Sequence, residues 1–350
     1  MLRTTATASA FVTVLPWLVH AVPAHTGCGS TRWIPGSTVS ETITDQGRER
    51  VFNVFVPNGY EPDTRTPIVL YFHGWGGNGN LNWMTNEANS ATFIAVGPTG
   101  VGGGANPDGG ANSWNGGGST TSSGGFGPPD ASCAEGSPQY CYDSCAARPQ
   151  GCHPCDWTTC NDDISFTDAL LDWLEEELCV DPARVFVTGH SNGGQFAWAV
   201  AARLANRIAA TVPSAGTPHA AFGEGPVSRP VSVMDVHGKF DTICPANWTD
   251  PSTDGWYYEM VPIMCTLWSE ADGCQPTLEH YPMSLDHQNG LYCIKQGKCE
   301  EGIDVVRCAW EGGHGMYNNL ATIMWEFFAA HPMSPERLLH RFADDKADGH

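Results

Sequence analysis

Basic side chains are scarce in this chain of 350 residues: 17 lysines and arginines stand against 38 aspartates and glutamates, for a formal net charge of −21 at pH 7. A nucleic-acid-binding protein needs clustered cations to contact the phosphates, and the sequence contains no such cluster. The acidity therefore argues against a polyanionic partner. A neutral or weakly charged substrate is the easiest one to accommodate.

Long apolar runs are also missing after the first two dozen residues, so no later stretch has the length to span a bilayer. Residues 1–24 have the features of a secretory signal. Arg3 gives a positive start, residues 10–19 form the apolar stretch, and the small residues Ala21 and Ala24 offer cleavage sites. The stretch is too short for a membrane anchor, so we expect a secreted, extracellular protein.

Cysteine, in contrast, is abundant, and all fourteen cysteines follow the expected cleavage site. An even number of cysteines in an exported chain indicates a disulfide framework, here of seven bridges, whose pairing the spacing does not reveal. Asn247 begins the tripeptide Asn-Trp-Thr, an acceptor sequence for N-glycosylation that fits the same export route.

Short apolar runs alternate with segments of helical periodicity along most of the chain. Residues 38–44 and 50–57 have the composition of a hairpin around Gln46-Gly47. Further strands are expected at residues 67–72, 92–96, 184–188, 208–212, 230–236 and 303–309, and helices at 164–178, 195–206, 257–272 (broken at Pro262) and 317–330. This order predicts an α/β fold with a mostly parallel sheet, covered by helices on both faces. A polar C-terminal tail follows at residues 331–350.

Residues 97–162 interrupt this alternation with a Gly-rich half and a second half that holds six cysteines. The insertion leaves from the carboxyl end of a predicted strand, which is the edge where open α/β sheets bind ligands. It is either a lid or rim over a pocket, or a disulfide knot that tethers a surface loop. The spacing of Cys152 and Cys155 leaves a zinc site as a third interpretation. As a lid, it would offer the substrate the flat faces of Trp114, Phe126, Tyr140, Tyr142 and Trp157.

A nucleophile motif occurs at residues 189–193 (GHSNG), between a β-rich run and a helical one. A serine hydroxyl attacks a carbonyl only if a base takes its proton and if it stands clear of the sheet on a strained turn. Gly189 and Gly193 remove the side chains that would crowd such a turn. This context favours Ser191 as a nucleophile over a plain Gly-rich connection.

An oxyanion hole needs backbone N–H groups that point to the developing negative charge. Asn192, directly after the serine, offers one. The second is expected from residues 73–77 (HGWGG), with Trp75 as the donor and Gly74 as the alternative. The candidate substrate contacts around this centre are His73, Trp114 and His190.

In folds that carry this serine turn, the acid and then the histidine follow along the chain. Asp241 lies just after a predicted strand, whereas the alternative, Asp235, lies inside it. His314 follows the final strand among glycines that free the backbone to turn the ring toward Ser191. Less favourable positions are held by His219, His280 and His287. The expected triad uses neither a metal ion nor an organic cofactor.

Taken together, these residues resemble the secreted feruloyl esterase and polyhydroxybutyrate depolymerase family of α/β-hydrolases. The resemblance covers about residues 27–329, and its motifs are residues 27–29 (GCG), 56–60 (VPNGY), 71–76 (YFHGWG), 180–185 (VDPARV), 188–194 (TGHSNGG), 237–241 (HGKFD), Trp268 with 273–274 (GC), and 312–314 (GGH). It implies one catalytic domain at residues 25–330 that hydrolyses carboxylic esters through an acyl-enzyme, with the triad Ser191, Asp241 and His314.

Two departures from the family pattern leave the substrate open: the density of cysteines in residues 133–160, and Cys244 within a usually aliphatic stretch. The main expectation is an esterase that acts on plant cell-wall polysaccharide esters, of the feruloyl type first. Alternatives are a polyhydroxybutyrate or other polyester depolymerase and an acetylxylan-type esterase. A non-catalytic, disulfide-rich binding protein is a further alternative, against which the complete triad argues.

Overall fold

The computed structural model describes residues 27–103, 110–116, 132–137, 140–149, 151–152, 155–220, 222–226, 228–300 and 302–338. The expected signal segment, Phe126 and the end of the polar tail lie outside these residues. Over the ranges given, the structure contains no helix of the length and apolarity that crossing a membrane requires.

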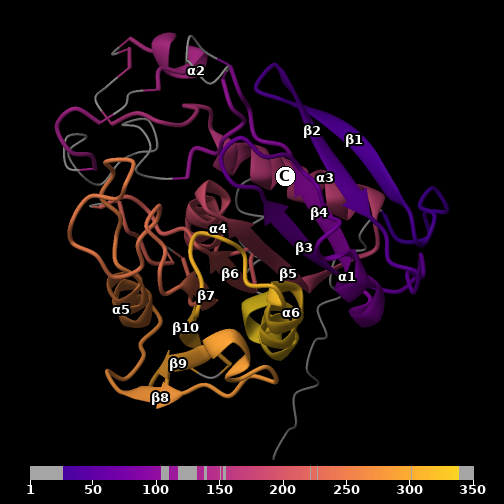
Figure 1. Ribbon diagram of the computed structural model, residues 1–350. Coiled ribbons are helices and arrows are strands. Elements are labelled where there is room, and N and C mark those ends of the chain that lie inside the picture. The colour runs from indigo at the N-terminus through magenta and orange to yellow at the C-terminus, as the bar shows by residue number, and fades with distance from the viewer. Residues whose placement is uncertain are drawn as a thin grey trace, which may run out of the picture.

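A ten-stranded sheet in the order β1-β2-β4-β3-β5-β6-β7-β10-β9-β8 forms the centre of the molecule (Figure 1). Its six middle strands are parallel, and antiparallel pairs close both edges. The strands are β1 (Thr38–Asp45), β2 (Arg48–Phe55), β3 (Thr66–Phe72), β4 (Ile94–Pro98), β5 (Val180–His190), β6 (Ala210–Ser214), β7 (Ser232–Gly238), β8 (Leu278–His280), β9 (Tyr292–Gln296) and β10 (Val305–Trp310).

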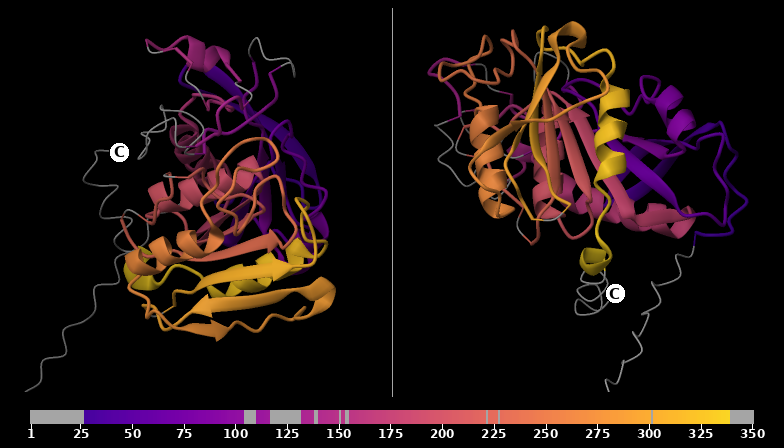
Figure 2. Two further views of the ribbon diagram at one scale, coloured as in Figure 1. Left: turned by 60° about the vertical axis from the view of Figure 1, so that its left-hand side comes forward. Right: turned by 90° about the horizontal axis from the view of Figure 1, so that it is seen from below.

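Helices cover both faces of the sheet (Figure 2). They are α1 (Thr85–Ala91), α2 (Asp143–Ala146), α3 (Asp163–Glu177), α4 (Asn192–Arg203), α5 (Val261–Ala271) and α6 (Leu320–Ala330). Successive residues of a strand point to opposite faces. In β3, Ile68 and Leu70 therefore join the core under α3, α4 and α5, while Val69 and Tyr71 join the core under α1 and α6. The predicted fold class is confirmed.

Several element boundaries differ from the expectation. The helix expected at residues 257–272 with a break at Pro262 begins at that break: residues 257–260 are not helical, and Pro262 lies in the first turn of α5, where its missing N–H is not needed. Thr92 ends α1 in the left-handed conformation, so β4 begins two residues later than expected. The sequence pattern missed α1 itself and the edge strands β8 and β9, which are too short or too exposed to carry a clear period.

The expectation of seven disulfides is wrong by one, because the fourteen cysteines form six bridges. Cys244 and Cys265 remain as buried thiols. Cys152 and Cys155 have disulfide partners, so neither offers the thiolate that the zinc interpretation requires. The bridges are Cys28–Cys179, Cys133–Cys155, Cys141–Cys152, Cys145–Cys160, Cys274–Cys299 and Cys293–Cys308, and three of them lie within the insertion.

We predict that the protein unfolded without a reductant exposes two thiols, because Cys244 and Cys265 lie in different, buried surroundings. Alkylation in denaturant followed by peptide mass spectrometry should modify these two cysteines alone. Prior reduction should raise the number to fourteen. A peptide that links residue 244 to residue 265 would contradict the pairing.

Candidate active site

The turn between β5 and α4 holds Ser191 in an unusual backbone conformation, with φ 57° and ψ −122°. The turn is possible because the backbone passes very close to itself. A Cβ at position 189 would lie 2.1 Å from the carbonyl oxygen of Gly193, and one at position 193 would lie 2.0 Å from that of Phe72. Both positions therefore require glycine, and the strained turn presents the hydroxyl above the sheet edge.

Three side chains that lie far apart in the sequence meet at this edge. The Ser191 hydroxyl oxygen lies 2.8 Å from Nε2 of His314, and Nδ1 of that ring lies 2.9 Å from Oδ2 of Asp241. The serine follows β5, the aspartate follows β7 and the histidine follows β10. Because these strands are parallel, their carboxyl ends lie at the same edge and bring the three predicted residues into one hydrogen-bonded chain.

The carboxylate of Asp241 is held on both of its oxygens. Oδ1 accepts the backbone N–H groups of Ile243 and Cys244, each at 2.9 Å, and Oδ2 faces His314. Burial by itself would raise the pKa of Asp241, but hydrogen bonds from His237 and His314 keep that pKa well below its usual range. This group therefore stays ionised and can orient the imidazole at any ordinary pH.

His237 is a part of the site that the sequence reasoning did not assign. Its ring is buried between two carboxylates, with Nδ1 3.3 Å from Oδ1 of Asp235 and Nε2 3.5 Å from Oδ2 of Asp241. Nε2 also lies 2.7 Å from the carbonyl oxygen of Cys244. Burial lowers the pKa of His237, but the two carboxylates outweigh it and raise the pKa to about 10. A buried imidazolium thus supports Asp241, the expected acid of the triad, and Asp235, the alternative acid, faces this cation.

The loop after β3 lies against the nucleophile. A Cβ at Gly74 would stand 3.3 Å from Cβ of Ser191, and the next residue, Trp75, lines the same pocket. Asn192 is the first residue of α4, and the first N–H groups of a helix have no partner within it. The two expected oxyanion donors therefore lie on adjoining segments beside the hydroxyl.

His73 and Trp114 brace this loop and do not offer their polar atoms to a substrate. Nε2 of His73 accepts the N–H of Gly100 at 2.9 Å, which leaves Nδ1 to donate to the Gly74 carbonyl at 2.7 Å. Burial lowers the pKa of His73 to about 4, so the ring is neutral. Trp114 is 0% exposed, and its indole donates to the His73 carbonyl at 3.0 Å. Backbone hydrogen bonds thus occupy the polar atoms of both side chains, and the expectation that they contact a substrate directly stays a prediction.

His190 does line the pocket, together with Ser191. Its Nε2 donates to the carbonyl oxygen of His314 at 3.1 Å, which fixes the loop that carries the triad histidine. Burial and the neighbouring His314 lower the pKa of His190 to about 4, so this ring is neutral at pH 7. Of the remaining candidate histidines, His219 is buried behind Trp157 of the pocket wall, whereas His280 and His287 are exposed beside Tyr292.

The pocket that ends at the triad has a volume of about 350 Å³ and mostly aromatic walls; we call it the serine pocket. Tyr140 and Trp157 come from the insertion, and the Tyr140 ring stacks at 6.0 Å on Trp256. Tyr142 is buried under Trp75 and accepts its indole N–H at 3.0 Å. The lining is Gly74, Trp75, Tyr140, Trp157, His190, Ser191, Ile243, Cys244, Asp254, Trp256, Tyr258 and His314.

Comparison with known proteins places these features in a family context. The chain is 28% identical over 309 residues to feruloyl esterase C of Emericella nidulans, a match that covers 85% of this chain and 91% of that one. It is 24% identical over 329 residues to feruloyl esterase D of Neurospora crassa, covering 91% and 94%. Along most of its length the chain is therefore similar to two feruloyl esterases. No family model matches the sequence.

A second group of relatives consists of acetylxylan esterases. The chain is 23% identical over 296 residues to the bifunctional acetylxylan esterase/xylanase XynS20E of Neocallimastix patriciarum, covering 83% of this chain and 34% of that protein. Among solved structures, the acetyl xylan esterase from Aspergillus awamori superposes with a TM-score of 0.50 and 14% identity, over 83% of this chain and 99% of that one. The superposition confirms the α/β-hydrolase fold.

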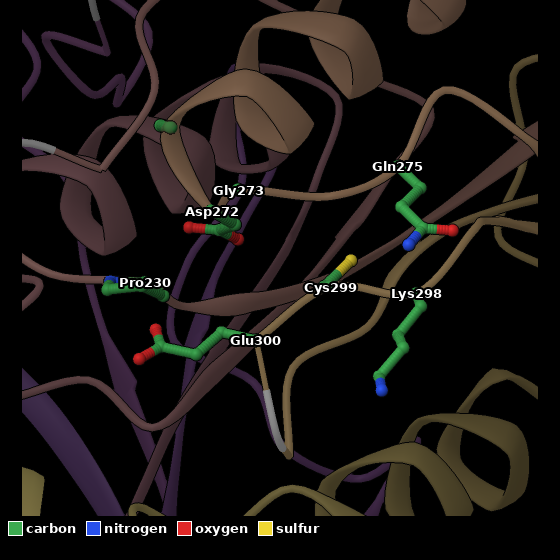
Figure 3. A pocket seen from close by; sticks show the side chains of 8 residues that line it. Pro230, Asp272, Gly273, Gln275, Lys298, Cys299 and Glu300 are labelled. Carbon is green, nitrogen blue, oxygen red and sulfur yellow. The ribbon is translucent and has the colours of Figure 1, made fainter.

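Another pocket, of about 520 Å³, shares no lining residue with the serine pocket (Figure 3). Its notable member is Asp272, whose Oδ1 accepts the Val231 N–H at 3.3 Å. Oδ2 is buried and, within the residues that the structure covers, has no hydrogen-bond partner. Burial raises the pKa of Asp272 to about 8, so this carboxyl is protonated at neutral pH.

We predict that Asp272→Asn stabilises the protein as the pH rises. An unfolded aspartate ionises near pH 4, whereas the folded Asp272 stays protonated up to about pH 8. The free energy of unfolding of the natural chain therefore falls as the pH rises between these values. Asparagine does not titrate. The melting temperature of the variant, relative to the natural chain, should increase from pH 4 to pH 8 by at least about 2 °C. A pH-independent difference would contradict the raised pKa.

We also predict that His237→Asn moves the acidic limb of the pH profile of kcat/KM upward by about one pH unit. Removing the hydrogen bond and positive charge of His237 raises the pKa of Asp241 and makes it easier to add a proton to the hydrogen-bonded pair of Asp241 and His314, so the active form is lost at a higher pH as the solution is acidified. His331→Asn is the matched control, since His331 is also buried beside a carboxylate, that of Asp304. The role of His237 would be contradicted if both variants melted at the same temperature and the acidic limb of the kcat/KM profile shifted in neither.

Proposed function

We propose that this chain is a secreted serine esterase that hydrolyses esters of plant cell-wall polysaccharides, with a preference for feruloyl and similar aromatic acyl groups. The observation that carries the proposal is the aromatic pocket that ends at the hydrogen-bonded chain of Ser191, His314 and Asp241. The homologous feruloyl esterases support the ester chemistry.

The geometry supports an acyl-enzyme mechanism. The Ser191 hydroxyl attacks the ester carbonyl carbon as its proton passes to Nε2 of His314, and Asp241 stabilises the resulting imidazolium. The N–H groups of Asn192 and Trp75 bind the oxyanion. Collapse of this intermediate breaks the bond to the alcohol, which takes the proton from the histidine. A water molecule then repeats the sequence and releases the acid.

The acyl preference follows from the walls of the serine pocket. Rings of Tyr140, Trp157 and Trp256 offer a planar aromatic group the offset-stacked and edge contacts that such groups prefer. A volume of about 350 Å³ is in the range of small-molecule sites and is generous for an acetyl group. The pocket therefore favours a feruloyl ester over acetylated xylan.

Export is supported by independent features. Six disulfides require an oxidising compartment to form and persist. Asn247 is exposed, as an acceptor for N-linked glycan must be. These observations agree with a signal peptide at residues 1–24 and an extracellular site of action.

We predict that a fluorophosphonate probe labels Ser191 and that Ser191→Ala abolishes both labelling and turnover. Asp241→Asn should keep the fold and lower kcat by about 10⁴-fold, because it favours the wrong imidazole tautomer. Labelling is read by mass spectrometry, and turnover on methyl ferulate, acetylated xylan and short polyhydroxybutyrate side by side. Methyl ferulate should be the preferred substrate. An unlabelled folded protein would indicate a binding protein instead, and preference for the polyester would overturn the proposed substrate class.

A further inference from the structure

A second pocket of about 470 Å³ adjoins the serine pocket at the loop between β3 and α1. The two pockets share Gly74 and Trp75, so the indole of Trp75 is a wall of both. Since a Cβ at Gly74 would stand 3.3 Å from that of Ser191, the second pocket begins beside the nucleophile. An ester has an acyl part and an alcohol part on either side of the attacked carbonyl. If the acyl part occupies the serine pocket, the alcohol part needs a neighbouring pocket.

The lining of the second pocket carries no net charge at neutral pH, although the chain as a whole has a net charge of −21. Its two ionisable members stay neutral, because burial lowers the pKa of His73 to about 4 and raises that of Tyr71 to about 12. Besides Gly74 and Gly77, the other members are three amides and two indoles: Asn78, Asn80, Asn82, Trp75 and Trp83. This composition suits a neutral polar ligand and offers a carboxylate-bearing sugar no cation.

The amide side chains are arranged by the backbone. Oδ1 of Asn78 accepts the N–H of Asn80 at 3.1 Å, and Oδ1 of Asn80 accepts the N–H of Asn82 at 2.9 Å. Asn78 and Asn80 thus use their amide oxygens to hold the loop and keep their NH₂ groups as donors. The loop is pinned to the sheet at Gly79, whose carbonyl accepts from Asn53 at 2.8 Å. Donors fixed before binding lose little entropy when a ligand arrives.

The aromatic side of the second pocket complements these donors. Trp83 packs edge-on against Tyr71 with ring centroids 5.0 Å apart, and both line the pocket. The indole nitrogen of Trp83 is buried and has no hydrogen-bond partner in the part of the chain that the structure covers. A saccharide presents hydroxyl groups to amides and C–H faces to aromatic rings, which is the combination found here.

We propose that the second pocket is the subsite for the alcohol part of the ester, a neutral sugar residue of the polysaccharide. The proposal rests on the esterase function proposed above. It commits the chain to recognition on both sides of the scissile bond: aromatic rings for the acyl group and a ladder of amides for the sugar. A second acyl unit of a polyester is a poorer occupant, since it has few hydroxyl groups for the NH₂ donors.

The test compares two feruloyl esters that differ in the alcohol alone, methyl ferulate and a feruloylated neutral arabinoxylan oligosaccharide. Asn80→Asp keeps the oxygen that accepts the N–H of Asn82 but replaces the NH₂ donor, so the loop should stay folded. The expected result is a fall of about fivefold in the ratio of kcat/KM for the sugar ester to that for the methyl ester, the effect of one lost hydrogen bond. Asn78→Asp should act likewise, and Trp83→Leu should lower the same ratio.

Asn86→Asp is the matched control, because Asn86 is an exposed asparagine of α1 outside the pocket lining and gains the same charge. Its ratio should equal that of the natural chain. If the natural chain cleaves both esters and the ratio is the same in all variants, the subsite is overturned while the esterase function stands. If the natural chain cleaves neither ester, the proposed function itself has failed.

Discussion

The close approach of the backbone at the serine turn is the constraint on which the site depends. The chain leaves β5, reverses at Ser191 with positive φ, and enters α4 so tightly that positions 189 and 193 have no room for a Cβ. This turn does three things at once. It lifts the Ser191 hydroxyl out of the sheet, places the first N–H groups of α4 directly after the serine, and brings the loop after β3 into contact with it. The strain is sustained because buried strands on both sides of β5 fix the ends of the turn.

A second layer of the site is electrostatic and lies beneath the turn. The ring of His237 lies between the side chains of Asp235 and Asp241, so the expected acid of the triad, Asp241, faces a buried cation that also contacts Asp235. A lone carboxylate at this depth would tend to protonate and release His314. The buried histidine prevents this, which extends the ionised state of Asp241 into acidic solution. The orienting group is thus held by charge as well as by the two backbone N–H donors of the following turn.

Local sequence predicted the parts of the site that local chemistry dictates. The positions of Ser191, Asp241 and His314 followed from a glycine pattern and from loops at strand ends, and the structure brings these residues together. The burial of Trp114 did not follow, because a tryptophan in a polar, Gly-rich stretch looks exposed until α4 and the loop after β3 pack over it. Nor did the charge of His237, which depends on two carboxylates, or the pairing of the cysteines, which depends on the folded insertion. The features that the sequence did not reveal all arise from contacts between segments that lie far apart along the chain.

The insertion links the two sides of the proposed substrate through one hydrogen-bonded contact. Its buried Tyr142 accepts the indole N–H of Trp75 and donates to the carbonyl of Ala111, so the position of the indole is set from the insertion. Trp75 in turn lines both the serine pocket and the second pocket. A short crosslinked segment cannot bury enough apolar surface to hold such a position, and its three internal disulfides supply the rigidity that a core would give elsewhere. The dense cysteines of the insertion thus help to fix one indole that lines both pockets: the insertion shapes the proposed acyl and alcohol subsites together, whereas Ser191, Asp241 and His314 lie on the sheet edge.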